Sequence, residues 1–522
     1  MSYLELLRLA APEAILVVTA LVVLTIGLVT GRRSAGATVS VAGNAGAGSA
    51  AKAFAGDTPA TTASLALCSL VAAFGLAIAA AVIVRLPAHA MLFHGMLVIS
   101  PLNSLFKIIC LVLAFFTVLL VRGERSLPNQ GEYLALILLA TIGLLLLVGS
   151  EELLMIFIGL ELTGLSLYVL AAFDKAEQRS AEAGLKYFLF GSMASAVTLF
   201  GLSFVYGLTG TTSLAALGER LTTLPIEPLL AAGIVMTLIG FAFKIAAAPF
   251  HLWAPDAYQG APVSTAAFIA SGSKVASFVV LGKIVLIGFG PAHGSADWHA
   301  MVAGWTPVLA VLAALSILLG NFVALVQKNV RRLLAYSAVA HAGYTLLGLV
   351  AAGRDGFAAT LFYTTIYGLT LIGAFGIVAF VRRETGGEDL RDFAGLRERS
   401  PLLAGCMAVF MLSLAGLPPL AGFFGKFYLF SAALRAGPNH GLLWLVVLAL
   451  FGSLVSLYYY LIVLKVIYLG EAAPIRVDDQ RYDFEKRADL VPKMAVLLLA
   501  GSVLLLGIVP GALVERILAS LP

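Results

Sequence analysis

Long apolar segments, separated by short polar turns, run along almost the whole chain. A helix needs about 20 mostly apolar residues to cross a membrane, and 14 segments of this kind are bounded by charged residues, Gly or Pro. They predict an all-α polytopic membrane protein with about 14 transmembrane helices. The predicted helices cover residues 12–30, 63–84, 101–121, 132–149, 153–172, 184–208, 228–250, 261–288, 302–326, 333–352, 357–381, 402–434, 441–469 and 491–514.

The composition indicates a protein that consists of membrane helices and little else. Of its 522 residues, 61% are hydrophobic and 12% are charged, whereas roughly a quarter of the residues in a soluble domain are charged. We therefore expect a single integral membrane domain over residues 1–522 and exclude a soluble enzyme. Residues 31–62 are rich in Ala, Gly, Ser and Thr, which predicts a flexible loop. No basic stripe suggests a nucleic-acid partner.

The loops on the two sides of the membrane differ in basic charge. In and beside one set of loops, which includes residues 31–62, Lys and Arg number 20, whereas the opposite set has six. Because cytoplasmic loops carry an excess of Lys and Arg, this asymmetry places the first set, including the 31–62 loop, in the cytoplasm. Both chain termini are then predicted on the outer, periplasmic side.

Seven lysines lie inside the apolar segments and need a physical explanation. An amine near a helix end can extend to the lipid headgroups, whereas an amine at the centre of the bilayer is costly. Lys274 is in the middle of its segment, and Lys244 and Lys426 lie beside proline breaks, so these three are functional candidates. Extension to the membrane surface accounts for the other four, which are Lys107, Lys186, Lys283 and Lys465.

Two of the predicted helices contain proline breaks. Pro249 leaves a backbone carbonyl without its helical partner, and Pro418 and Pro419 interrupt the twelfth segment in the same way. Lipid offers no hydrogen bonds, so broken backbone at this depth must face protein or a hydrated cavity. Lys244 and Lys426 adjoin these breaks, although a purely architectural proline kink is the alternative.

The two broken helices are five passes apart, and an odd number of passes reverses the direction of the chain across the membrane. This arrangement is typical of the inverted repeats that build transporter sites near the bilayer midplane. We predict a first repeat, helices 4–8, over residues 132–288 and a second repeat, helices 9–13, over residues 302–469.

One carboxylate and one imidazole complete the candidate site. Glu161 is the ninth residue of the fifth segment, and a buried carboxylate either neutralises or pairs with a cation such as a buried lysine. Burial also makes a lysine easier to deprotonate, so the pair can carry a proton; a permanent Glu–Lys bridge is the alternative. His341, mid-span in the tenth segment, is either a proton relay or a hydrogen-bonded core residue. Lys186 and His251, near helix ends, are weaker candidates.

Motifs for redox and nucleotide chemistry are absent from the sequence. It contains no P-loop, no usable dinucleotide fingerprint and no haem or iron–sulfur spacing. Cys68, Cys110 and Cys406 stand singly in apolar segments, which is typical of buried structural cysteines. We therefore expect no cofactor and no metal in this chain.

The candidate residues lie in motifs that resemble the antiporter-like subunits of respiratory complex I, the proton-translocating NADH–quinone oxidoreductase. The resemblance covers nearly the whole chain and is nearest to the N-type branch. M-type subunits typically carry Glu where Lys426 stands, and L-type subunits continue into a long lateral helix, whereas this chain stops at Pro522. The motifs are G-x-E-L at Glu161, F-K-x-A-x-x-P-F-H-x-W-x-P-D-A-Y at Lys244, S-x-x-K at Lys274, Y-S-x-x-x-H-x-G-Y at His341 and G-x-P-P-x-x-G-F-x-x-K at Lys426.

The resemblance implies a proton channel in which Glu161 pairs with Lys244, protons pass Lys274 and His341, and Lys426 governs the far exit. It also implies a bacterial inner-membrane location and, as partners, membrane lipid and other membrane subunits of the complex. Through those subunits the chain would connect to a peripheral arm that holds NADH, FMN, iron–sulfur clusters and quinone. Two alternatives remain open: a subunit of a multisubunit cation/proton antiporter, and a passive membrane scaffold.

Overall fold

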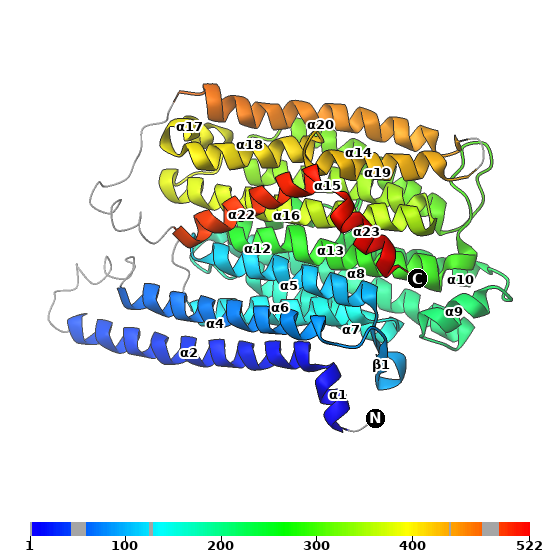
Figure 1. The fold of residues 1–522 in the computed structure, drawn as a ribbon, viewed down its shortest axis with the longest axis horizontal. Helices are drawn as coiled ribbons and strands as arrows, with labels where there is room; N and C mark the ends of the chain where they lie inside the picture. The colour runs from blue at the N-terminus through cyan, green and yellow to red at the C-terminus, as the bar shows by residue number, and fades with distance from the viewer. Residues whose placement is uncertain (1–2, 43–58, 125–128, 438–439, 472–489, 522) are drawn as a thin grey trace.

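The fold is a bundle of long, roughly parallel helices (Figure 1). The computed structural model describes residues 3–42, 59–124, 129–437, 440–471 and 490–521. Most of the spans are single helices: α2 (Ala11–Ala42), α4 (Pro59–Val84), α5 (Pro101–Val121), α6 (Gln130–Gly149), α7 (Leu153–Ala171), α8 (Gln178–Thr209), α14 (Trp305–Leu325), α15 (Val330–Val350), α16 (Gly353–Thr385), α20 (Leu443–Leu469) and α22 (Leu490–Ile508).

Two spans are broken and a third is irregular within the described residues. The seventh span consists of α10 (Pro228–Lys244) and the short α11 (Trp253–Gly260), and the twelfth consists of α18 (Pro401–Ala415) and α19 (Ala421–Arg435). The eighth span is continuous but contains two π-helical turns, and its parts are α12 (Val263–Phe268), η2 (Ile269–Ser273), α13 (Lys274–Lys283) and η3 (Ile284–Gly288).

Short elements join the spans at their ends. The strands β1 (Ala90–Leu92) and β2 (Leu97–Ile99) form an antiparallel hairpin, in which Ala90 pairs with Ile99. The other short elements are helical: α1 (Tyr3–Leu9), η1 (Phe93–Gly95), α9 (Leu214–Leu221), η4 (Gly290–Ala292), η5 (Leu390–Phe393), α17 (Leu396–Arg399) and α23 (Gly511–Ser520).

The helices confirm the predicted all-α polytopic membrane protein. Among the described residues, 12 helices are long and apolar enough to cross a membrane, and the shorter apolar helices α10 and α18 belong to the two broken spans. Each of the 14 predicted segments coincides with one of these spans. In the seventh segment the helix ends at Lys244 and not at residue 250, because the break begins several residues before Pro249.

The predicted loop over residues 31–62 overlaps helix at both ends. The helix α2 continues to Ala42 and α4 begins at Pro59. Ala, Ser and Thr, which are frequent in this tract, are compatible with helix, so composition alone placed the end of α2 too early and the start of α4 too late. Residues 43–58 lie outside the described part of the chain.

Burial separates central helices from peripheral ones. The eighth span, α15 and α16 are almost wholly buried, whereas only 28% of the apolar window is buried in α8 and in residues 11–30 of α2. The buried helices nevertheless carry polar groups, including Lys274 in α13 and His341 in α15. Burying a polar group costs free energy unless the group has hydrogen-bond partners. The polar residues at the centre of this bundle are therefore the candidates for a functional site.

Candidate functional site

Lys244 is the last residue of α10, at the point where the seventh span breaks. Its side chain is buried, and its amine donates to the Leu160 carbonyl and to the Tyr168 hydroxyl of α7, both at 3.4 Å. The indole of Trp253, at the start of α11, donates to the Phe243 carbonyl at 3.1 Å. The broken backbone therefore finds its partners inside the protein, as predicted.

Glu161 and Lys244 line the same small cavity between α7, α8 and α10. The carboxylate of Glu161 is half-buried and accepts a short hydrogen bond from the Ser195 hydroxyl of α8. The residues around the cavity are Phe157, Leu160, Glu161, Ala194, Ser195, Thr198, Gly240, Phe243 and Lys244.

The direct ion pair predicted between these two residues is not formed in the described structure. Glu161 is bonded to Ser195, and Lys244 is bonded to α7. Burial of both charges predicts the pair, but the sequence does not reveal that a hydroxyl binds Glu161 and that a hydroxyl and a backbone carbonyl bind Lys244.

Lys274 begins α13, directly after the π-helical turn η2. Its amine is buried and donates to the Ala338 carbonyl of α15 at 2.7 Å. It also lies over the ring of Tyr367, 5.5 Å from the ring centroid, where a cation is attracted to the aromatic face. Lys274 therefore faces α15, which contains His341, and α16.

His341 is bonded on both sides of its ring. Nδ1 lies 2.6 Å from the Tyr363 hydroxyl of α16, and Nε2 lies 2.9 Å from the Tyr460 hydroxyl of α20. Tyr460 in turn contacts the hydroxyl of Ser337. A neutral imidazole with a hydroxyl on each nitrogen can accept a proton on one side and donate one on the other.

Lys426 lies in α19, just after the second break. Its amine donates to the Ala415 carbonyl at 3.0 Å and to the Ser453 hydroxyl at 2.9 Å, and it lies 5.1 Å from the centroid of the Tyr344 ring. Gly416 has a positive φ of 85°, and a Cβ there would come within 2.9 Å of the Lys426 side chain. The break thus requires glycine beside this amine.

The helix α15 connects the second group of candidates. Ala338, His341 and Tyr344 follow one another at intervals of three residues, so they lie on one face of the helix. This face touches Lys274 at Ala338, the two tyrosines at His341 and Lys426 at Tyr344. The structure therefore brings Lys274, His341 and Lys426 to one line of contacts, whereas Glu161 and Lys244 form a separate pair across their cavity.

The two weaker candidates have different surroundings. Lys186 is partly exposed and forms ion pairs with Glu182 at 2.6 Å and with Asp256 of α11 at 2.7 Å, so it is a paired group and not a free one. His251 is buried in the break between α10 and α11, and its Nδ1 has no partner among the described residues.

Two lysines that were expected to reach the membrane surface are in fact buried. Lys107 forms an ion pair with Glu13 of α2 at 2.6 Å, and Lys283 donates to the Val148 carbonyl at 2.8 Å. A buried partner was available in each case, so neither amine extends to the headgroups. Glu13 is itself more buried than Glu161.

The hydrogen-bond partners of the candidates are the residues that the sequence did not single out. Tyr168, Tyr363 and Tyr460 are tyrosines inside membrane spans. A tyrosine hydroxyl in such a place requires a partner, which is a usable signal, but the pattern along one helix does not reveal which neighbour supplies it. Within the described residues, no group of three or more His, Cys, Asp or Glu side chains could hold a metal ion.

This chain matches a known protein family and several of its members. Residues 150–455 match the family described as NADH:quinone oxidoreductase/Mrp antiporter, TM. NADH-quinone oxidoreductase subunit N 2 of Acidobacterium capsulatum is 43% identical, over 98% of this chain and 99% of the relative. NADH-quinone oxidoreductase subunit N of Desulforamulus reducens is 41% identical, over 81% of this chain and 85% of the relative.

Solved structures agree with the relatives. A chain of respiratory complex I from Thermus thermophilus with bound aureothin is 32% identical, with a TM-score of 0.72, over 97% of this chain and 98% of that one. A chain of the Mrp complex from Dietzia sp. shares the fold, with a TM-score of 0.76 at 21% identity over 99% of this chain and 97% of that one. The chain therefore belongs to the family of NADH-quinone oxidoreductase N subunits.

Proposed function

We propose that this chain translocates protons as a membrane subunit of NADH-quinone oxidoreductase, through a relay of Glu161, Lys244, Lys274, His341 and Lys426. The observation that carries the proposal is a pair of tyrosine rings that connect the three groups. The Tyr367 ring lies below the Lys274 amine and 4.9 Å from the His341 ring, and the Tyr344 ring lies 5.6 Å from the His341 ring and below the Lys426 amine. Three groups that can gain or lose a proton are held there in the most buried part of the bundle.

The cavity of Glu161 and Lys244 forms the other half of the relay. Both groups line it, and neither is locked to the other. We infer that Lys244 alternates between its present hydrogen bonds to α7 and an ion pair with Glu161. A lysine that changes partner changes its proton affinity, because an opposite charge favours its charged form and burial disfavours it.

The remaining features follow from this assignment. The chain binds no redox cofactor itself, and NADH, FMN, iron–sulfur clusters and quinone are held by other subunits of the complex. It lies in the bacterial inner membrane with both termini on the periplasmic side, and residues 132–288 and 302–469 are inverted repeats. Its partners are the other membrane subunits, lipid and, through those subunits, the peripheral redox arm.

The test removes each charge of the first pair. In Glu161→Gln and in Lys244→Ala, the proton yield per NADH should fall while the complex still assembles, since each variant removes one titratable group. Sealed vesicles of the assembled enzyme give the yield. Glu227→Gln, at the exposed residue before α10, and Lys465→Ala, at an exposed residue of α20, serve as matched controls. Wild-type yields in both site variants would contradict the relay.

The two alternative functions predict different partners and effects. A mass-spectrometric inventory of the chains that leave the membrane with this one should contain redox subunits. Membrane chains alone would instead favour a multisubunit cation/proton antiporter, which the fold shared with the Mrp complex makes the nearest alternative. Full pumping without Glu161 would favour a passive scaffold.

A further inference from the structure

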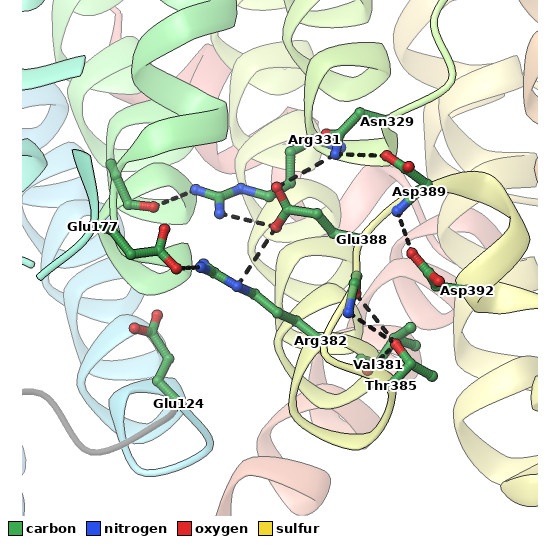
Figure 2. A network of polar contacts seen from close by, with 12 residues as sticks. Glu124, Glu177, Asn329, Arg331, Val381, Arg382, Thr385, Glu388, Asp389 and Asp392 are labelled. Carbon is green, nitrogen blue, oxygen red and sulfur yellow. Dashed lines mark hydrogen bonds and ion pairs between the residues drawn. The ribbon is translucent and has the colours of Figure 1, made fainter. Parts of the chain in front are cut away.

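A second charge cluster, buried at Arg331 and partly exposed at Glu177, lies at one end of the bundle, away from the proposed relay. It consists of Arg331, Glu388, Arg382 and Glu177, which Figure 2 shows together. Arg331 lies 3.1 Å from Glu388, and Arg382 lies 2.6 Å from Glu177 and 3.9 Å from Glu388. The cluster joins the start of α15, the end of α16, the loop after α16 and the residue before α8. Neither the sequence motifs nor the proposed relay accounts for it.

Arg331 is the most buried member and makes contacts beyond its ion pair. Its side chain has no exposed surface. Its Nε donates to the Tyr258 carbonyl at 2.6 Å, and its Nη2 donates to the Ala261 carbonyl through a short hydrogen bond. These carbonyls belong to the C-terminal end of α11 and the turn into α12, where a helix leaves its last carbonyls without partners. The guanidinium supplies donors for both.

The next residue of α15 holds the same short helix. Arg332 donates to Asp256 at 2.6 Å and to the side-chain oxygen of Gln259 at 3.2 Å. Asp256 also binds Lys186 of α8. The two arginines at the start of α15 therefore bind α11 in two ways. Arg331 binds its terminal carbonyls, and Arg332 binds its side chains.

The other end of α11 lies next to Lys244. Trp253, its first residue, donates to the carbonyl of Phe243, the residue before Lys244. The eight residues of α11 span about 12 Å at a rise of 1.5 Å per residue. A short rigid helix thus has Arg331 at one end and the backbone of the Lys244 break at the other, so a shift at Arg331 moves the segment that follows Lys244.

A neighbouring carboxyl does not take the place of Glu388. Glu124 accepts a short hydrogen bond from the Ser264 backbone amide, at the start of α12. Burial raises the pKa of the Glu124 carboxyl, more than this hydrogen bond and the nearby Arg331 and Arg382 lower it. Figure 2 shows no contact between Glu124 and either guanidinium. Glu388 is therefore the counter-ion of Arg331.

We propose that Arg331 is a positioning residue that holds α11 against α15 and so keeps the Lys244 side of the relay in register with the His341 side. This inference rests on the proposed relay. It adds to the relay a residue that contacts neither the cavity of Glu161 and Lys244 nor the groups that carry the proton. The competing explanation is charge balance, in which Arg331 serves only to neutralise Glu388. The two explanations differ in what happens when both charges are removed together.

Three variants of the assembled enzyme separate these explanations. Arg331→Met removes both the charge and the donors to α11, and Arg331→Lys keeps the charge but offers one compact amine in place of a planar fork. Arg331→Met with Glu388→Gln removes both charges and still leaves the Tyr258 and Ala261 carbonyls without donors. Arg391→Met is the matched control, because Arg391 is exposed and lies 3.9 Å from Asp389 in the same loop region.

The first readout is the proton yield per NADH in sealed vesicles, and the second is hydrogen exchange of residues 253–262 compared with residues 274–283. We expect lower proton yield and at least about tenfold faster exchange in α11 for Arg331→Met and for the double variant, the factor that loss of one charge-assisted hydrogen bond gives. Arg331→Lys should be intermediate, and Arg391→Met should match the wild type.

Two outcomes overturn the inference. Recovery of proton yield in the double variant would show charge balance, and unchanged exchange in α11 would show that Arg331 does not hold this helix. If Arg331→Met fails to assemble, Arg331→Lys and the double variant carry the same two readouts. The relay itself is judged separately, because its failure appears as full pumping in Glu161→Gln and Lys244→Ala.

Discussion

Two glycines stand directly against the amines of the broken helices. A Cβ on Gly164 of α7 would lie 2.7 Å from the Lys244 amine and 3.0 Å from the Tyr168 hydroxyl, and Gly416 has the same relation to Lys426. The missing side chain leaves each amine the space that it occupies. At the residue scale, the site therefore depends on the missing side chain of the neighbouring glycine as well as on each lysine itself.

Gly164→Ala should displace the Lys244 amine without removing any charge. We expect a clearly reduced proton yield per NADH with normal assembly, because a misplacement of about 1 Å can cost up to about a hundredfold in rate. The measurement is proton translocation in vesicles of the assembled variant. Gly405→Ala in α18 is the control, since nothing lies within 4 Å of a Cβ there. Equal yields in the two variants would show that the position of Lys244 is not critical.

The sequence was more informative about which residues matter than about their contacts. Lys244, Lys274 and Lys426 were singled out because amines at this depth are costly, and all three are buried. Glu161 and Lys244 do not contact each other directly in the described structure, because Ser195 of α8 binds the carboxylate and Tyr168 of α7 binds the amine. The chemistry of one residue limits what it needs, but the packing of helices decides which neighbour provides it.

At the scale of elements, the prolines predicted the positions of the helix breaks correctly. The position of a lysine along its segment, in contrast, did not predict whether its amine is buried. The spans break beside Pro249 and beside Pro418, where the ring removes a helical hydrogen bond. Lys107 and Lys283 lie part of the way between a helix end and the middle of the span, and their amines were expected to extend to the membrane surface. Depth along a helix does not reveal whether another helix presents a carboxylate or a carbonyl to that amine.

The ion pair between Lys107 of α5 and Glu13 of α2 should stabilise the contact between these helices. Lys107→Met leaves a buried carboxylate without its partner, which costs about 3–5 kcal/mol, so the assembled enzyme should lose this chain at a lower temperature. Adding Glu13→Leu should recover most of the loss, because an apolar pair replaces a buried ion pair at little cost. Thermal dissociation in detergent measures both, with Lys465→Met as the control. No change in Lys107→Met would mean that the pair is not structural.

At the scale of the whole molecule, the length of the apolar segments predicted the architecture. The number of spans and the all-α class followed from apolar length, and these are properties of the bilayer more than of any particular contact. The inverted repeats and the sidedness remain predictions. The hydrogen bonds from Arg331 to the end of α11 were not predicted, because the Tyr258 and Ala261 carbonyls are about 70 residues away in the sequence and belong to another span.

Sidedness can be tested with single cysteines on the two ends of the bundle. We predict that an impermeant thiol reagent, applied to spheroplasts, labels a cysteine at Glu219 and not one at Arg397. Both positions are exposed, and the native Cys68, Cys110 and Cys406 are buried, so background labelling should be low. Labelling at Arg397 alone would invert the topology that the basic loops predict.

The central claim is that Lys244 carries a proton and does not merely balance a charge, and Lys244→Arg tests it most directly. Arg keeps the positive charge and can still bind Glu161, but it does not release its proton in a protein. The measurement is proton translocation per NADH in sealed vesicles of fully assembled enzyme. We predict a yield well below the wild type with normal assembly. A wild-type yield in Lys244→Arg would contradict the account.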